Sequence, residues 1–222
     1  MGKIYQGILG KVSGKVGSVV GSSWKGIPTV RIYNETVANP RTAAQVENRG
    51  HFATVTAIGS SLLASIVKPF WDRFALKQSG YNAFVNANMR GLDFESIPTT
   101  IVLSKGNLAM PTISPSFVQD AEDIKVTWNP NERQRYDLST DKLWAVLMNK
   151  DTGEFIGAPL YTSNVGGVQA TRAAGTGYLK DADIPDTWVP AANKYALAVL
   201  AMREDSTQVS LSVGVTNVSY VG

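Results

Sequence analysis

The chain has 222 residues, of which 44% are hydrophobic, 18% are charged and none is cysteine. This length suits one large domain or two small ones, and the composition is that of a globular protein with a sizeable core. The lack of cysteine excludes disulfides and thiolate sites, and no apolar run is long enough to predict a signal peptide or a membrane span.

Charge is distributed unevenly along the chain. Residues 1–106 contain 12 Lys and Arg against 5 Asp and Glu, whereas residues 107–222 contain 9 against 13. A basic half joined to an acidic half indicates two modules with different surroundings. The basic half could face nucleic acid or an acidic protein surface, or the two halves could neutralise each other within an assembly. Contact with nucleic acid is the less favoured of these interpretations.

The first 38 residues are rich in glycine and in β-branched residues. Each glycine at positions 7, 10, 14, 17 and 21 would weaken a helix by about 1 kcal/mol relative to alanine. We therefore predict short twisted strands, or an arm that lies on another surface, with a turn over residues 21–26. So little of this segment can be buried that a free-standing domain is not expected.

A helical region follows, beginning at residues 39–42 (Asn-Pro-Arg-Thr). Thr42 and Gln45 have the spacing of a capping box, in which each side chain satisfies a free backbone N–H of the other residue. Apolar residues then recur in steps of three and four as far as Phe74, which predicts an amphipathic helix or a pair of helices. Pro69 lies inside this pattern, so a break or kink is expected just before it.

The pattern changes twice more along the chain. Ser79-Gly80 ends the first helical region, and a shorter helix is predicted over Tyr81–Arg90, with Gly91 at its C-terminal cap. From Ile97 onward, turn signals separate about seven predicted strands, which is typical of an immunoglobulin-like or fibronectin-III-like β-sandwich. These strands are predicted at residues 101–103, 124–128, 143–148, 154–160, 168–172, 195–202 and 209–215.

The predicted fold class is therefore α+β, divided into three parts. Residues 1–95 form a Gly-rich extended or β arm and a helical anchoring region. Residues 96–111 form a linker or strand. Residues 112–222 form the seven-stranded immunoglobulin-like sandwich.

No catalytic motif is present in the sequence. His51 is the single histidine, and its place beside Phe52 in the predicted helix favours packing or solvent exposure over catalysis. Gly-x-Ser-x-Gly and His-Glu-x-x-His motifs are both absent. Gly10-Lys11 and Gly14-Lys15 resemble part of a phosphate loop, but neither is followed by Ser or Thr, so we reject that interpretation.

One acidic cluster could gather a cation. Asp181, Asp183 and Asp186 lie close together in the sequence, but their spacing is not that of a calcium loop, so a solvated acidic loop is favoured. We therefore predict a structural or binding protein that is not an enzyme and that uses no cofactor, metal or small-molecule substrate.

The candidate functional residues are the basic and aromatic residues of the N-terminal segment and the residues of the 39–45 motif. They are Lys11, Lys15, Trp24, Lys25, Arg31, Tyr33, Asn39, Pro40, Arg41, Thr42 and Gln45. Interleaved aromatic and cationic groups occur in nucleic-acid footprints and also in segments that dock on a neighbouring subunit. Docking on a neighbouring subunit is the favoured interpretation.

Several segments in roughly the first 110 residues resemble a known family. They are Gly2-Lys3-Ile4-x-Gln6-Gly7-Ile8-Leu9-Gly10, Ser13–Gly17, Ser23–Gly26, Asn39-Pro40-Arg41-Thr42-x-x-Gln45 and Ser79–Asn82. The family is an uncharacterised one, of about this chain length, from Bacteroidota bacteria and their phages, including crAss-like phages. The resemblance transfers no activity and no catalytic residue. It implies a capsid-associated, head-fibre or tail-associated virion protein that is assembled in the cytoplasm of a bacterial host.

Three functional hypotheses follow. The first is a non-enzymatic virion structural protein that anchors through its N-terminal half, presents a β-sandwich, and contacts other virion proteins or further copies of itself. The second is a bacterial surface module that binds glycan or protein, which the lack of a predicted signal peptide weakens. The third is a packaged protein whose basic half binds nucleic acid with an affinity that falls steeply with salt. No membrane partner is expected.

Overall fold

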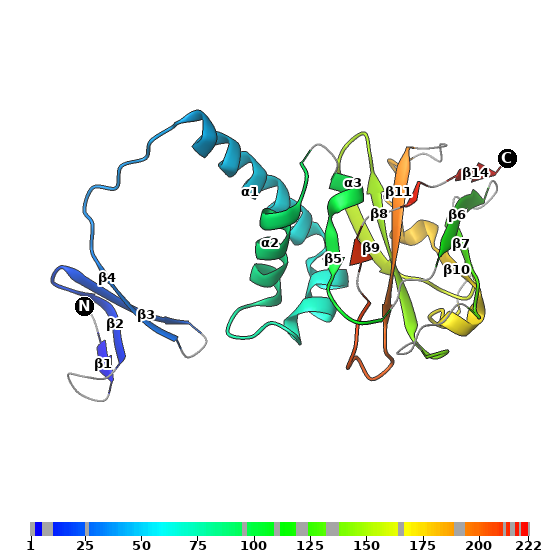
Figure 1. Ribbon diagram of the computed structural model, residues 1–222, viewed down its shortest axis with the longest axis horizontal. Helices are drawn as coiled ribbons and strands as arrows, with labels where there is room; N and C mark the ends of the chain where they lie inside the picture. The colour runs from blue at the N-terminus through cyan, green and yellow to red at the C-terminus, as the bar shows by residue number, and fades with distance from the viewer. Residues whose placement is uncertain are drawn as a thin grey trace.

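The computed structural model of the chain shows a mixed α+β protein (Figure 1). A small N-terminal sheet is followed by a group of helices and then by several small sheets. The structure describes residues 3–5, 11–24, 27–94, 97–108, 112–118, 124–131, 138–163, 167–188, 194–210, 212–213, 216–217 and 219–221. The predicted α+β fold class is confirmed.

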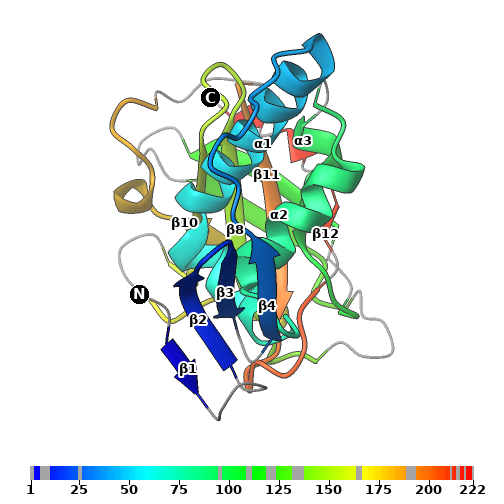
Figure 2. The same ribbon diagram turned by 90° about the vertical axis from the view of Figure 1, so that its left-hand side faces the viewer.

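The N-terminal sheet is antiparallel, with its four strands in chain order: β1 (Lys3–Tyr5), β2 (Lys11–Val16), β3 (Val19–Trp24) and β4 (Ile27–Ile32). Figure 2 shows the strands side by side. Gly17 adopts a φ of 56° in the turn between β2 and β3, a conformation that two-residue hairpin turns require and that glycine adopts at little cost.

The predicted turn over residues 21–26 is wrong for residues 21–24, which belong to β3. Residues 25–26 lie outside the described part of the chain. Gly21 serves a close approach of two strands, because a Cβ there would lie 2.3 Å from the Val12 carbonyl oxygen. A glycine that marks a strand contact and a glycine that marks a turn are not distinguished by composition alone.

The predicted helical region consists of two helices joined by a sharp bend. Helix α1 (Ala43–Ser61) and the π-helix η1 (Leu63–Asp72) meet at an angle of 96°. The bend therefore lies at Leu62, and the predicted break before Pro69 is wrong. Pro69 lies inside η1, where backbone N–H groups bond five residues back; having no N–H, Pro69 leaves one such bond unmade without ending the helix.

A third helix, α2 (Gly80–Gly91), follows the π-helix. The Ser79 hydroxyl accepts a hydrogen bond from the Asn82 backbone N–H at 3.1 Å, so Ser79 caps the start of α2. One turn of helix, α3 (Ile97–Thr100), precedes the β-structure. Among the described residues, no single helix is long and apolar enough to cross a membrane, and α1 and η1 reach that length and composition only as a bent pair.

The central sheet has the strand order β13-β11-β8-β9. Its two inner strands are long: β8 (Lys142–Asn149) and β11 (Tyr195–Met202). Its edge strands are β9 (Phe155–Pro159) and β13 (Thr216–Asn217). Every residue of β11 is buried. Alternate side chains of a strand point to opposite faces, so a strand covered on both faces is a continuous apolar run. The sequence of β11 has this form.

The central sheet separates two hydrophobic cores. The helices pack on one face, where Phe70, Phe84 and Leu200 are among the buried residues. The sheet β10-β7-β6-β14 shares the core on the other face, where Val126 and Leu197 are buried. This second sheet contains β6 (Ile113–Val118), β7 (Ile124–Trp128), β10 (Thr176–Leu179) and β14 (Ser219–Val221). A separate two-stranded sheet consists of β5 (Val102–Ser104) and β12 (Ser212–Val213).

The strand prediction holds for most of the predicted segments. The strand at 101–103 corresponds to β5, and the strand at 209–215 contains β12, with residues 211, 214 and 215 outside the described part of the chain. Strands at 124–128, 143–148, 154–160 and 195–202 are confirmed in substance by β7, β8, β9 and β11. The strand predicted at 168–172 is wrong, since Gln169 and Thr171 make only isolated bridges and a 3-10 helix, η2 (Arg172–Ala174), follows. The described strands form several small sheets, mostly antiparallel, and no closed sandwich.

Candidate functional site

The N-terminal sheet brings four of the predicted functional residues onto one face. The strand register places Lys15 and Arg31 on either side of Val20 across β2, β3 and β4. Trp24 lies four residues after Val20 in β3, so it points to the same face. The Lys15 ammonium lies 3.4 Å from the centre of the Tyr33 ring, a cation–π contact. We call Lys15, Trp24, Arg31 and Tyr33 the basic–aromatic face.

The opposite face of the sheet is apolar. Val16, Val19 and Ile32 lie in one row across the strands, and Val30 pairs with Gly21 in the next. Val30 is 67% exposed and Ile32 is 80% exposed. We call Val16, Val19, Val30 and Ile32 the apolar face, which sequence analysis missed although Val30 and Ile32 alternate with polar residues along β4.

The sheet stands apart from the rest of the molecule (Figure 1). Residues 27–50, which comprise β4, the linker and the start of α1, are all exposed. Trp24, at the end of β3, is 62% exposed. We call residues 43–221 the body of the protein. Neither face of the sheet is covered by the residues of the body that the structure describes.

The motif at residues 39–45 fixes the place where the linker leaves α1. The Thr42 N–H donates to the Gln45 carboxamide oxygen at 3.4 Å, so the predicted capping box is present. Arg49, one turn further along α1, donates to the Asn39 side-chain oxygen and to the Pro40 carbonyl. These contacts assign the motif a positioning role, and Arg49 is a member that sequence analysis missed.

The remaining predicted site residues belong neither to the basic–aromatic face nor to the contacts of the 39–45 motif. Arg41 is exposed next to the capping box. Lys25 and the side chain of Lys11 lie outside the described part of the chain. His51 stacks on Phe94 with ring centres 3.7 Å apart and planes 6° from parallel, which confirms packing as its role.

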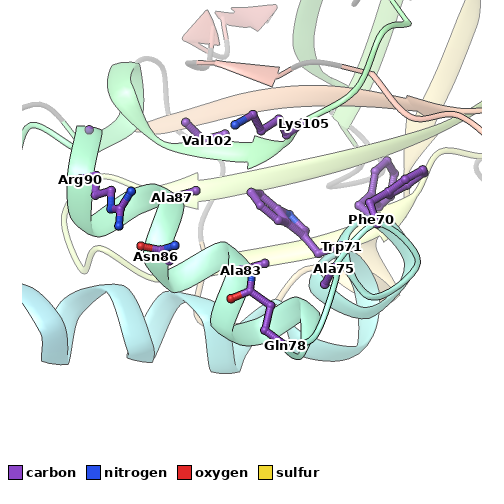
Figure 3. Close-up of a pocket in the computed structure, with 12 residues that line it drawn as sticks. Phe70, Trp71, Ala75, Gln78, Ala83, Asn86, Ala87, Arg90, Val102 and Lys105 are labelled. Atoms are coloured by element: carbon purple, nitrogen blue, oxygen red, sulfur yellow. The ribbon is translucent and has the colours of Figure 1, made fainter. Parts of the chain in front are cut away.

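Among the pockets that open on the described part of the body, two differ in charge. The first, of about 590 Å³, lies between η1, α2 and β5, and its charged lining residues are Arg90 and Lys105 (Figure 3). The second, of about 560 Å³, lies between α1 and the turn that precedes β9, and Glu154 is its charged lining residue. We call them the basic pocket and the acidic pocket. Neither was predicted, because each is assembled from distant segments.

The described side chains of the acidic loop at residues 181–186, which do not include that of Asp181, show no arrangement for holding a metal. Within the ranges that the structure describes, no group of three His, Asp or Glu side chains could hold an ion. Asp183 belongs to a short 3-10 helix, η3 (Asp181–Asp183), and its Oδ2 atom is buried without a hydrogen-bond partner in the described part of the chain.

Replacing Asp183 by asparagine is expected to raise the melting temperature at neutral pH. Burial raises the pKa of Asp183 above its ordinary value of 3.8, and Lys180 opposes this shift. The folded protein then holds the proton more tightly than the unfolded chain, so this carboxyl stabilises the fold less as the pH rises through the raised pKa. Thermal melts should show the gain at pH 7 and none at about pH 3, where both states are protonated. A lower melting temperature for Asp183→Asn at pH 7 would contradict this account.

Comparison with known proteins places the chain in a family. The model of DUF6266, a family of unknown function, matches residues 10–216. The chain belongs to DUF6266. The match extends well beyond the N-terminal segments that carried the resemblance in the sequence and covers most of the β-structure. No curated protein matches the sequence, so the function has to be argued from the surfaces of the molecule.

Proposed function

We propose that this DUF6266 protein is a non-enzymatic structural subunit of a larger assembly. In this proposal the N-terminal sheet anchors the subunit, and the body, with its two cores, is the part presented. The resemblance to phage proteins makes a virion the expected assembly, as a capsid-, head-fibre- or tail-associated component. An immunoglobulin-like arrangement of residues 112–222 belongs to the same proposal. It is supported by the hydrophobic core that the central sheet shares with the sheet β10-β7-β6-β14.

The observation that carries this proposal is the uncovered N-terminal sheet. A small sheet gains stability when its hydrophobic face is removed from water by packing against another surface. Here Val30 and Ile32 are mostly exposed on one face and Trp24 on the other. Exposed apolar patches of this kind mark interaction sites, so a partner surface is the simplest cover for the sheet.

The anchoring proposal is tested by placing charge on the apolar face of the full-length protein. We expect the double variant Val30→Lys/Ile32→Lys to lose at least tenfold in affinity for assembled particles, because two lysines cannot be buried there without large desolvation costs. The measurement is co-sedimentation with particles purified from the expressing host.

The matched control is Leu76→Lys, since Leu76 is 87% exposed on the body and should bind as the wild type does. All three proteins should unfold at the same temperature, because the substituted residues lie outside both cores. Undiminished sedimentation of the double variant would refute anchoring through this face.

Nucleic-acid binding is the second candidate, and the basic–aromatic face favours it. Aromatic and cationic side chains on one sheet face provide stacking and phosphate contacts for single strands. Under this alternative, the affinity for single-stranded DNA falls steeply as salt is added. The substitution Lys15→Glu weakens DNA binding, whereas the double variant on the opposite face does not.

A further inference from the structure

The basic pocket has the size of a small-molecule site. Twelve residues line it, between η1, α2 and β5 (Figure 3). Its volume of about 590 Å³ falls within the roughly 300–1,000 Å³ of pockets that hold small ligands. A stable protein interface involves about 20–30 residues on each side. A small molecule therefore fits this pocket better than a partner protein does.

Aromatic side chains form one wall of the pocket, and the Trp71 ring is held in place there. Its indole N–H donates to the Leu103 carbonyl oxygen at 2.8 Å, and the ring meets that of Phe84 edge to face with centres 5.7 Å apart. Phe74, which also lines the pocket, is 44% exposed. Because Trp71 is already fixed, it loses little conformational entropy when a ligand packs against it.

Small residues of α2 leave the space that the pocket offers. Ala83, Ala87 and Gly91 follow one another at intervals of four residues, so they lie on one face of the helix, and all three line the pocket. A Cβ added at Gly91 would meet no atom within 4 Å. A larger side chain on this face, such as leucine in place of Ala87, would therefore take up room that a ligand needs.

Both charged residues of the pocket are cations that no other part of the described chain engages. Arg90 lies on α2, and Lys105 directly follows β5. Neither makes an ion pair or a hydrogen bond with a described residue. Arg73, just after η1, is different, because its guanidinium donates to the carbonyls of Asp205 and Ser206 at 3.1 and 2.8 Å. The donors of Arg90 and Lys105 are therefore available to a ligand.

The polar lining of the basic pocket selects a ligand of negative charge. Arg90 and Lys105 are hydrogen-bond donors that cannot accept, and Asn86, one turn before Arg90 on α2, adds an amide to the same lining. No Asp or Glu occurs among the described lining residues. The acidic pocket would repel the same ligand through Glu154. Charge and hydrogen bonding thus both favour an anion at the basic pocket.

We propose that the basic pocket binds a small organic anion with an apolar, ring-containing body. The body packs between Trp71 and the small residues of α2, and Arg90 and Lys105 hold the anionic group. No Ser, Thr, His, Asp or Glu is found among the described lining residues, so the site binds a ligand without a nucleophile and base to transform it. The inference is independent of the anchoring proposal, because the pocket contains no residue of the N-terminal sheet.

The test titrates the full-length protein with two fluorescent probes. Anilinonaphthalene sulfonate is an organic anion, and phenylnaphthylamine has the same ring system without the charge. We expect the wild type to bind both at a single saturable site. Ala87→Leu fills the pocket and should raise both dissociation constants at least tenfold. The matched control is Ala53→Leu, on an exposed part of α1 outside both pockets, which should bind both probes as the wild type does.

Charge reversal in the pocket should act on the anionic probe alone. Arg90→Glu and Lys105→Glu should each raise the dissociation constant of the anionic probe at least fivefold and change that of the neutral probe less than about twofold. Lys125→Glu is the matched control, because Lys125 lies on β7, in the sheet on the other side of the central sheet. This variant should bind both probes as the wild type does, and thermal melts establish that every variant is folded.

Three outcomes would overturn the inference, and each leaves the anchoring proposal to its own co-sedimentation test. The first is a wild type that binds neither probe. The second is charge reversal that affects both probes equally or neither, which would show that the pocket does not select an anion. The third is loss of probe binding in Val30→Lys/Ile32→Lys, which would place the probes on the apolar face of the N-terminal sheet. If Ala87→Leu does not fold, the charge-reversal variants decide the question.

Discussion

Replacing Asp141 by alanine is expected to lower the free energy of unfolding by about 3–5 kcal/mol. Asp141 is fully buried, and its Oδ2 atom lies 3.3 Å from Nε of Arg172, whose side chain is 2% exposed. The same oxygen accepts the Leu138 N–H at 2.8 Å. Removing the carboxylate leaves a guanidinium in the core without its counter-charge and a backbone N–H without its acceptor, and both losses are costly.

A surface ion pair next to this site provides the control. Lys142 and Glu204 lie 3.8 Å apart with side chains 36% and 64% exposed, so Glu204→Ala should cost less than about 1 kcal/mol. Both variants are measured by urea unfolding at one pH. A cost of less than about 1 kcal/mol for Asp141→Ala would show that the buried pair is not a major source of stability.

A double-variant cycle separates the pair from its surroundings. Arg172→Met removes the buried cation but keeps an apolar side chain of similar length. If the cost of Asp141→Ala comes from the stranded guanidinium, then the double variant Asp141→Ala/Arg172→Met is less destabilised than the sum of the single variants. Additive costs would indicate that the two side chains act independently of each other.

The sequence predicted those elements whose pattern is decided locally or by complete burial. The apolar run of β11 reflects burial on both faces of the central sheet, and the spacing of Thr42 and Gln45 reflects a cap closed within one helical turn. Features that depend on distant contacts were mispredicted. Gly21 serves the approach of Val12, and the helix bends at Leu62 although Pro69 carries the local signal for a break.

The candidate site was predicted in its residues but not in its arrangement. Composition identified Lys15, Trp24, Arg31 and Tyr33 as a group, and the strand register is what brings them to one face. The register of β2 against β3 depends on the turn at Gly17, which the sequence analysis did not predict. Alternation along β4 already places Val30 and Ile32 on one face, but only the register shows that Val16 and Val19 of the neighbouring strands lie beside them.

Replacing Asn88 by alanine is expected to lower the free energy of unfolding by about 2–4 kcal/mol, although the substitution improves helix propensity. Asn88 is buried in α2, where its side-chain N–H groups donate to the carbonyls of Phe84 and Val102, each at 3.0 Å. Its side-chain oxygen accepts the Val102 N–H at 2.9 Å. One side chain therefore satisfies both backbone groups of Val102 and joins α2 to β5.

Asn86 on the same helix is the matched control for Asn88. It is exposed at the basic pocket, and its replacement by alanine raises the helix propensity by the same amount. We expect Asn86→Ala to change stability by no more than about 0.5 kcal/mol, so the difference between the two variants isolates the buried hydrogen bonds. Asn88→Asp should be at least as destabilising as Asn88→Ala, because a carboxylate would face two carbonyl oxygens. Denaturant unfolding and amide hydrogen exchange at Val102 provide the measurements. Unchanged protection of the Val102 amide in Asn88→Ala would show that the helix–strand junction is held by apolar packing alone.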